Sequence, residues 1–401
     1  MFHYYVNDIL LFSQDVPKAI DEIKKAIRSN KISQQEIDKR CRKVLMAKKW
    51  MGLDKYKPVD LSIIHDHIIT EETKKLDKKL VQSSLTLLQN YGDLLPLKRL
   101  DTLQIALLNI GEEPVSSYEI ISQYAPVTKF AISENANISE QAILLNKLTK
   151  FNLVIVNVHK SNAHAWKSYK IPKETDVLLQ SIALQSKVVV SVFANPYSIN
   201  SFLSTDNFDA FIMSYQNSPV AKEQTAQAIF GGIGMNGKIP VTTKHFGINS
   251  GIQTFPTRMR YVDPLDIGFK SELLYKIDSI VEDAIFHKAT PGCQILIAKD
   301  GNIFFNKSYG YHTYNKEKIV QNSDVYDIAS ITKIVATVPL LMKMIDDGYL
   351  DLDNSLGEYL DLESTNKEDL IIRDVLAHQA RLKPWIPFYK RVLVEDTILP
   401  N

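Results

Sequence analysis

The residues with the clearest chemical potential are Ser330 and Lys333, which stand three positions apart at the start of an apolar segment. On a helix this spacing puts the hydroxyl and the amine on one face, so a partly desolvated Lys333 could take the serine proton and create a nucleophile. The alternative is that Ser330 is an ordinary helix N-cap. The same spacing recurs at Ser364 and Lys367, but that pair lies among turn residues with no apolar helix behind it. We interpret it as a chance match.

The elements around Ser330 can be predicted from local patterns. A helix is expected from Leu273 to about His287, followed by a hairpin around Asp300-Gly301, a dipeptide typical of two-residue turns. The remaining predicted elements are hairpin strands at 294–299 and 302–306, an apolar helical segment from Ser330 to near Gly348, a turn-rich passage at 349–360, and a helix at about 368–377. These elements would place Ser330 at a helix start in an α+β arrangement.

The order of these motifs over about residues 268–401 resembles the opening of β-lactamases, penicillin-binding proteins and related esterases. The motifs are the hairpin, Asp327-Ile-Ala-Ser330-x-x-Lys333, and Asp374-Val-Leu-Ala-His378. The resemblance implies that Ser330 is the acylated nucleophile and Lys333 its base or proton relay. It also implies that His378 is a structural histidine before a loop. In that loop Arg381 stands where the family usually has glycine, which matters if a positive φ is needed.

The family's Tyr-x-Asn element and its later Lys/His-Thr/Ser-Gly element would follow Lys333, and neither pattern occurs between Lys333 and position 401. We therefore expect an incomplete active site, in which Lys333 remains protonated and Ser330 is a poor nucleophile. The 294–309 hairpin would also lack the strands that normally cover it, so an apolar edge should stand open.

Upstream, the chain alternates between helix and apolar strand from about 72 to 245, which predicts a mostly parallel sheet covered by helices. The predicted strands are 104–110, 152–158, 187–194 and 209–214, with helices at about 138–149 and 174–185. The passage from Gly231 to Pro264 is rich in Gly and Pro and is the best linker candidate.

The first residues predict a βα unit and one more helix. Residues 9–12 are an all-apolar run typical of a strand buried on both faces, and helices are expected at about 16–28 and 33–50. Ser13 or Asp15 could cap the first helix, and Ser33 with Glu36 forms a capping-box pattern for the second. So few elements cannot make a domain and look like the end of one.

These upstream segments resemble family 3 glycoside hydrolases. The resemblance rests on Asn7–Phe12 followed by Asp15–Ile20, on Ser83–Asn90 with Leu94–Leu97, and on Phe230–Val241. It implies the end of a TIM barrel at 1–57, an α/β sandwich domain with linkers at 58–265, and an incomplete α+β β-lactamase-like domain at 268–401. The family's nucleophilic carboxylate, and the acid/base group of its N-acetylglucosaminidase branch, would lie before residue 7. Asp8 is an alternative carboxylate, which we interpret as a polar strand-end residue.

Other candidates have weaker patterns. Gly232-x-Gly234-x-x-Gly237 matches the dinucleotide fingerprint by letters, but a helix precedes it where a strand is required. His159, His164 and Trp166 follow a strand's carboxyl end, where α/β sheets often bind ligands. Because they have no metal-like spacing and no partner carboxylate, we interpret them as residues of an exposed loop.

Cys41 and Cys293 have no metal or redox spacing, and we interpret both as buried thiols. We predict no cofactor and no metal.

Composition narrows the partners. The 401 residues are 45% hydrophobic and 23% charged, with a net charge of +1. No cluster of basic and aromatic residues suggests nucleic acid, and no apolar run approaches a membrane span. The oligomeric state stays open. No signal peptide is recognisable, so the compartment is open as well, although the resemblance suggests the periplasm or cell envelope.

The combined reading is a fragment of a bifunctional hydrolase. It would join a β-N-acetylglucosaminidase-like glycosidase to a serine esterase, peptidase or β-lactamase, acting on small molecules or peptidoglycan-derived glycans. On this reading the fragment itself is inactive. The alternative is a non-catalytic binding or scaffolding protein built on the α/β sandwich.

Overall fold

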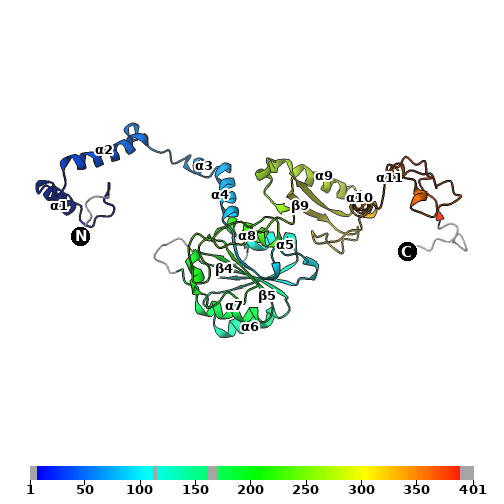
Figure 1. Ribbon diagram of the computed structural model, residues 1–401, viewed down its shortest axis with the longest axis horizontal. Helices are drawn as coiled ribbons and strands as arrows, with labels where there is room; N and C mark the ends of the chain where they lie inside the picture. The colour runs from blue at the N-terminus through cyan, green and yellow to red at the C-terminus, as the bar shows by residue number, and fades with distance from the viewer. Residues whose placement is uncertain (1–6, 112–114, 161–168, 389–401) are drawn as a thin grey trace. The chain divides into compact units, whose positions relative to one another are not determined.

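The computed structural model describes residues 7–111, 115–160 and 169–388. The chain divides into two compact units, Met1–Ile319 and Val320–Asn401, which are described separately. Figure 1 shows the elements of each unit.

The N-terminal helices form where the sequence predicts them. Helix α1 (Val16–Arg28) is capped by Asp15, whose carboxylate accepts from Lys18 N at 3.0 Å. Helix α2 (Gln34–Trp50) is capped by Ser33, but Glu36 pairs with Arg40 at 2.8 Å, and only the Ser33 half of the predicted capping box is seen. Two short helices follow, at Leu53–Lys55 and α3 (Ile64–Ile68).

The predicted barrel strand at residues 9–12 is wrong. These residues form no strand, and Leu11 and Phe12 are 80% and 93% exposed. A strand of a parallel sheet needs hydrogen-bonded neighbours, and among the described residues no strand lies beside this run. Cys41 on α2 is also exposed rather than buried, and Cys293 is half-buried.

The main sheet has six strands in the order β1-β6-β5-β4-β2-β3. All neighbouring pairs are parallel except β1 with β6, as expected for a mostly parallel α/β domain. The strands are β1 (Thr86–Asn90), β2 (Ile105–Ile110), β3 (Val127–Ile132), β4 (Leu153–His159), β5 (Lys187–Phe193) and β6 (Ala210–Met213). The sequence predicts β2, β4, β5 and β6 but not β1 or β3.

Helices cover both faces of this sheet, which gives a three-layer sandwich (Figure 1). Helices α6 (Ile138–Leu148) and α7 (Lys173–Ala183) pack on a core that contains Val156 and Val190. Helices α5 (Val115–Tyr124) and α8 (Pro219–Phe230) pack on the opposite core, which contains Leu107 and Ile155. Helix α4 (Glu71–Ser84) packs beside α8. Central strands buried on both faces explain why these segments of the sequence are apolar at most positions.

The Gly/Pro-rich passage is not a free linker over most of its length. Ile233, Met235 and Ile239 are at most 2% exposed, and Ile252 N donates to Leu87 O at 2.7 Å. The guanidinium of Arg258 donates to the carbonyl oxygens of Phe230 and Lys98. This passage is part of the α/β domain because its backbone closes the edge next to β1.

A three-stranded sheet follows, in the order β7-β9-β8. The strands are β7 (Arg260–Tyr261), β8 (Gly292–Lys299) and β9 (Asn302–Gly310), with helix α9 (Tyr275–Phe286) before the hairpin. Asp300 and Gly301 have φ of 51° and 75°, the left-handed pair that a two-residue type I′ turn requires. The predicted hairpin is confirmed, and β8 is the outer strand of the sheet.

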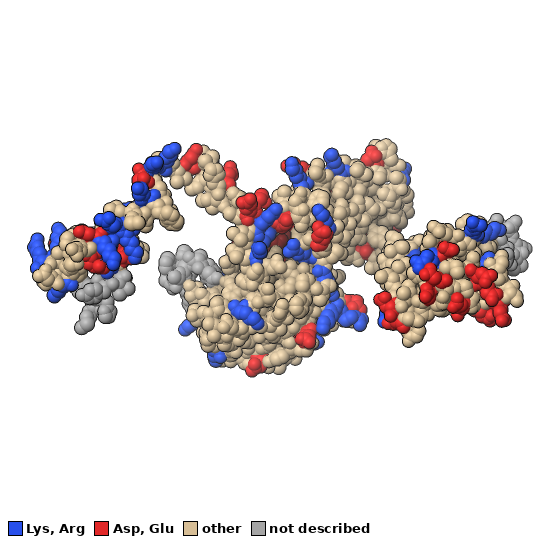
Figure 2. Space-filling model, turned by 45° about the horizontal axis from the view of Figure 1, so that its top comes forward, with Lys and Arg blue, Asp and Glu red and all other residues tan. Residues whose placement is uncertain are grey.

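The unit Val320–Asn401 is short of regular structure. It contains a 3₁₀ turn (Ala329–Ile331), a π-helical turn (Lys333–Thr337), α10 (Val338–Asp346), a 3₁₀ turn (Leu356–Glu358) and α11 (Ile372–Leu376). Apolar side chains on its helical stretch are exposed, including Ile334 at 67% and Leu340 at 61%. Acidic side chains gather on the face of this unit seen in Figure 2. No helix within the described ranges is long and apolar enough to cross a membrane.

Candidate active site and other functional residues

Ser330 and Lys333 lie together. The ammonium of Lys333 donates a hydrogen bond to Ser330 Oγ at 3.0 Å, and both side chains are exposed in their unit. The helical stretch from Ala329 to Asp346 places them on one face, as the i, i+3 spacing predicts. In this state the ammonium is the donor. Proton abstraction needs the reverse arrangement, in which a neutral amine accepts from the hydroxyl.

The backbone around Ser330 is unusual. Ala329, the residue before it, has a φ of 44°, a left-handed conformation that costs a residue with a Cβ about 1–2 kcal/mol. The carboxylate of Asp327 accepts from Ala329 N at 2.7 Å and holds this turn. Lys333 begins the π-helical turn, a feature that is frequent at functional sites. Strain at one residue beside a candidate nucleophile fits a functional constraint.

The second Ser-Lys pair does not form a comparable arrangement. Lys367 Nζ bonds to Asn366 Oδ1 at 3.0 Å, and Ser364 lies in a turn with a φ of 63°. The hydroxyl and amine of this pair share no hydrogen bond, which agrees with its reading as a chance match.

The loop after α11 keeps its left-handed turns without glycine. His378 has a φ of 58° and Arg381 a φ of 54°. Arg381 therefore adopts the positive φ that the family's glycine would take without strain. The arginine therefore adds backbone strain to a loop that still makes the left-handed turn.

Asp8 is held in a cluster of basic residues. Lys43 Nζ donates to its carboxylate, and Arg40 lies 3.7 Å away. The hydrogen bond from Lys43 lowers the pKa of Asp8. A carboxylate fixed by two cations of α2 fits a structural role.

The glycines at 232, 234 and 237 serve packing. A Cβ at Gly232 would collide with the Tyr124 hydroxyl, one at Gly234 with Thr254 O, and one at Gly237 with Ser84 O. No helix follows them within this passage, so the arrangement that holds a pyrophosphate is missing.

His159 is buried rather than in an exposed loop, which corrects the expectation from sequence. It is 5% exposed at the end of β4, and its ring nitrogens lie 2.9 Å from Asn217 Oδ1 and 3.0 Å from Asn109 Oδ1. The strand order reverses between β2 and β4, because β3 lies on one side of β2 and β4 on the other. Ligands often bind at such a switch point of an α/β sheet. His164 and Trp166 lie outside the described residues.

A buried polar row next to His159 was not recognised in the sequence. Asn109, Asn157 and Ser191 stand in register on β2, β4 and β5, each at most 2% exposed. Their signal was a polar residue inside each apolar run. Asn157 bonds to Ser117 at 3.1 Å, while Asn109 Nδ2 and Ser191 Oγ have no protein partner in the described part of the chain.

Two family models match this chain. Residues 85–282 match the model described as Glycosyl hydrolase family 3 C-terminal domain, and residues 277–392 match the model described as Beta-lactamase. Along the chain, a segment similar to the family 3 glycoside hydrolase C-terminal domain is therefore followed by a segment similar to the β-lactamase family.

Similar proteins cover parts of the chain. "Protein flp" of Staphylococcus aureus is 32% identical over 106 residues, which are 25% of this chain and 21% of that protein. A "Putative D-alanyl-D-alanine carboxypeptidase" of Salmonella enteritidis is 26% identical over 149 residues, 34% of each chain. The chain spans from about a fifth to a third of the length of these relatives.

Solved structures similar to part of the chain include a glycoside hydrolase family 3 enzyme and a β-glucosidase. A β-N-acetylglucosaminidase from Paenibacillus sp. is 21% identical with a TM-score of 0.40, covering 54% of this chain and 41% of that one. A β-glucosidase from Listeria innocua is 17% identical with a TM-score of 0.43, covering 55% and 33%.

Proposed function

We propose that Ser330 is the acylated nucleophile of a serine hydrolase and that Lys333 is its base. The observation that carries this is the 3.0 Å contact between Lys333 Nζ and Ser330 Oγ, next to the strained Ala329. The match of residues 277–392 to the β-lactamase family supports it.

The proposed reaction is acyl transfer from an amide, ester or β-lactam. Neutral Lys333 takes the Oγ proton as Oγ bonds to the carbonyl carbon, and the proton then passes to the leaving group as the scissile bond breaks. Water hydrolyses the acyl-serine in a second step. Both side chains are exposed in this unit, so further groups would enclose the Ser330–Lys333 pair in the active form of this site.

We also propose the division of labour along the chain. Residues 1–57 and 58–265 would belong to a glycosidase of the N-acetylglucosaminidase type, and residues 268–401 would begin the serine hydrolase. The parent would then be a bifunctional hydrolase of cell-envelope material, while these 401 residues alone would have little activity.

The test is covalent labelling with a fluorescent penicillin and a fluorophosphonate. The 401-residue chain is compared with the same sequence continued through the Tyr-x-Asn and Lys/His-Thr/Ser-Gly elements of a β-lactamase domain. Each is made as wild type, Ser330→Ala, and the matched control Ser364→Ala. We expect strong labelling only in the longer form, lost in Ser330→Ala and kept in Ser364→Ala.

Two outcomes would contradict the proposal. Strong Ser330-dependent labelling of the 401 residues would refute their low activity. Absence of Ser330-dependent labelling in both forms, with either probe, would refute the serine-hydrolase role of Ser330.

A further inference from the structure

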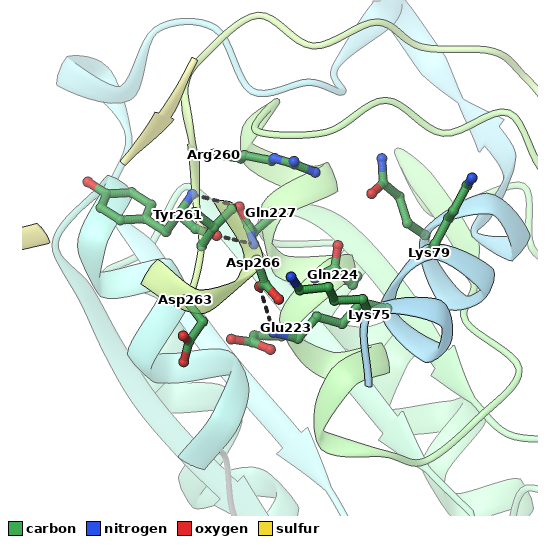
Figure 3. A pocket seen from close by; sticks show the side chains of 12 residues that line it. Lys75, Lys79, Glu223, Gln224, Gln227, Arg260, Tyr261, Asp263 and Asp266 are labelled. Carbon is green, nitrogen blue, oxygen red and sulfur yellow. Dashed lines mark hydrogen bonds and ion pairs between the residues drawn. The ribbon is translucent and has the colours of Figure 1, made fainter. Parts of the chain in front are cut away.

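A pocket of about 290 Å³ lies in the N-terminal unit where α4, α8 and the chain around β7 meet (Figure 3). Its walls include Lys75 and Lys79 of α4, Glu223 and Gln224 of α8, and Arg260 of β7. This volume is at the small end of the range of about 300–1,000 Å³ typical of ligand pockets. Its lining is polar and charged, so it suits a small hydrophilic molecule.

Three cationic side chains of the pocket have unused hydrogen-bonding capacity. Their neighbour Lys78 is paired with Asp266 at 2.7 Å, whereas Lys75 and Lys79 make no ion pair with any described residue. Arg260 uses Nε to bond to Asn302 Oδ1, which leaves its two terminal nitrogens for another acceptor. Figure 3 shows Arg260 reaching toward the side of the pocket that α4 forms. Such a group of donors favours a carboxylate or phosphate.

Gln224 supplies an independent indication of a ligand. It is only 8% exposed and lines the pocket, yet no protein group in the described ranges bonds to its amide. One turn away, Gln227 is fully used, because its amide bonds to both Tyr261 N and Tyr261 O at 2.9 Å. The dashed lines of Figure 3 show this contrast. The side chain is largely buried, but its amide atoms are accessible from the pocket, so the amide donor and acceptor are available to a bound molecule.

The acidic residues of the pocket limit the ligand's charge. Asp266 is neutralised by Lys78, and Asp263 accepts from Leu265 N at 2.9 Å. Glu223 is partly buried beside them, and it would repel a second anionic group of the ligand when ionised. A ligand with one anionic group and neutral hydroxyls satisfies both the cations and the acids.

We propose that this pocket binds a small polyhydroxylated molecule with a single carboxylate or phosphate group. The anionic group contacts Arg260 together with Lys75 and Lys79, and a hydroxyl bonds to the Gln224 amide. The site is separate from Ser330, and it requires neither catalytic activity nor the serine-hydrolase role proposed above.

The test is isothermal titration calorimetry of the 401-residue chain with glucuronate, glucose 6-phosphate and glucose. Glucuronate and glucose 6-phosphate share a hexose skeleton but carry the two candidate anions, and neutral glucose is the matched control. We expect at least one anion to bind with a Kd of about 1 mM or lower, and glucose to bind at least about tenfold more weakly. The stronger anion identifies the ligand as a sugar acid or a sugar phosphate.

Variants place the binding in this pocket. We expect three substitutions each to raise the Kd of the tighter-binding anion about three- to tenfold: Lys79→Gln, Lys75→Gln and Gln224→Met. Lys74→Gln is the matched control, because Lys74 is on the same helix but pairs with Glu71 at 2.7 Å outside the pocket. Gln224→Met removes no protein hydrogen bond, and the two lysine variants provide the test if it does not fold.

The proposal is overturned by any of three results. These are no heat from either anion up to about 20 mM, equal binding of glucose, and an effect of Lys74→Gln as large as that of Lys79→Gln.

Discussion

Arg260 of β7 and Asn302 of β9 are partners in the parallel ladder and also bond side chain to side chain, Nε to Oδ1. Arg260 lies in the segment that matches the family 3 domain alone, and Asn302 lies in the segment that matches the β-lactamase family alone. The two families therefore share one small sheet in this chain. The hairpin and the α/β sandwich belong to one compact unit, Met1–Ile319, and this pairing is one of the contacts between them.

A double-mutant cycle on Arg260→Ala and Asn302→Ala measures this connection. Because a hydrogen bond from a guanidinium is charge-assisted, we expect a coupling free energy of about 1–3 kcal/mol in urea unfolding. Asn302→Ala alone should cost more than Arg260→Ala, since Asn302 also caps the turn at Lys299 O and Asp300 O. The exposed pair Arg99 and Asp101 is the control and should show no measurable coupling. Zero coupling between Arg260 and Asn302 would show that this side-chain hydrogen bond contributes nothing to the stability of the shared sheet.

Glu223→Gln should stabilise the protein at neutral pH. Burial, the largest effect, raises the pKa of Glu223 above its ordinary value of 4.5; Lys78 opposes this shift, while Asp266, Asp263 and Glu119 add to it. The folded state thus holds this proton more tightly than the unfolded state. Its stabilising contribution is complete below pH 4.5 and is lost as the pH rises through the raised pKa. The glutamine of the variant cannot ionise, so the variant does not lose this stability as the pH rises.

Thermal unfolding from about pH 4 to 8 checks this sign. The melting temperature of Glu223→Gln should exceed that of the wild type at neutral pH, and the difference should vanish below pH 4.5. Asp278→Asn is the control of opposite sign, because the hydrogen bonds from Lys307 and Tyr309 lower the pKa of Asp278. A gain that is independent of pH would contradict this account.

Arg381→Gly should stabilise the loop after α11. Arg381 has a φ of 54°, so glycine removes the left-handed strain from the folded state. Glycine also increases the conformational entropy of the unfolded chain, which opposes this gain. We expect the first effect to be larger and the free energy of unfolding to rise by about 0.5–1 kcal/mol. Slower hydrogen exchange of the Val375–Gln379 amides would report it. Arg381→Ala keeps the Cβ and should leave exchange unchanged, so equal effects of both variants would assign the change to the lost arginine side chain.

The sequence predicts the buried centre of the sheet better than its edges. Strands β2, β4 and β5 are apolar at most positions because both faces are covered. Edge strand β3 carries the exposed Lys129, so its pattern is ambiguous, and β1 pairs with a strand more than 110 residues later. Residues 9–12 fail for the opposite reason: their composition suits a buried strand, but no neighbouring strand in the described chain buries them.

The same distinction separates the two candidate sites. Ser330 and Lys333 are brought together by one helical turn, which spacing alone can predict. The pocket around Gln224 is lined by residues of α4, α8 and β7. These residues lie far apart in the sequence, from Lys75 to Arg260, and only the folded structure brings them together. The local sequence does not distinguish Gln224 from Gln227. The two differ in their hydrogen bonds, which only the structure shows.

The chain should not cleave aryl N-acetyl-β-glucosaminides or aryl β-glucosides. In the segment that resembles the end of the barrel, the candidate carboxylate is Asp8. It pairs with Lys43 and Arg40, and its lowered pKa makes it a poor proton donor. Release of 4-nitrophenol from both substrates is the measurement. Turnover that Asp8→Asn abolishes, with Asp15→Asn as the control, would contradict the prediction.

The final prediction concerns the limits of the α/β domain. The alternation of the sequence suggests that residues 72–245 fold alone, but the structure shows contacts beyond both ends of that segment. Thr70 caps α4 by accepting from Thr73 N at 3.1 Å, and Thr254 N donates to Met235 O at 2.9 Å. The guanidinium of Arg258 holds the end of α8 through Phe230 O at 2.8 Å.

We therefore expect residues 70–262 to unfold in a single cooperative thermal transition and residues 72–245 to be less stable by about 3–5 kcal/mol. Loss of the Thr70 cap accounts for about 1 kcal/mol of this, and loss of the segment after residue 245 for the rest. Arg258→Ala in the longer segment should reproduce part of the difference, while Arg99→Ala, an exposed arginine on the same domain, should not. Equal melting temperatures of the two segments would mean that the passage after residue 245 packs on the domain without stabilising it.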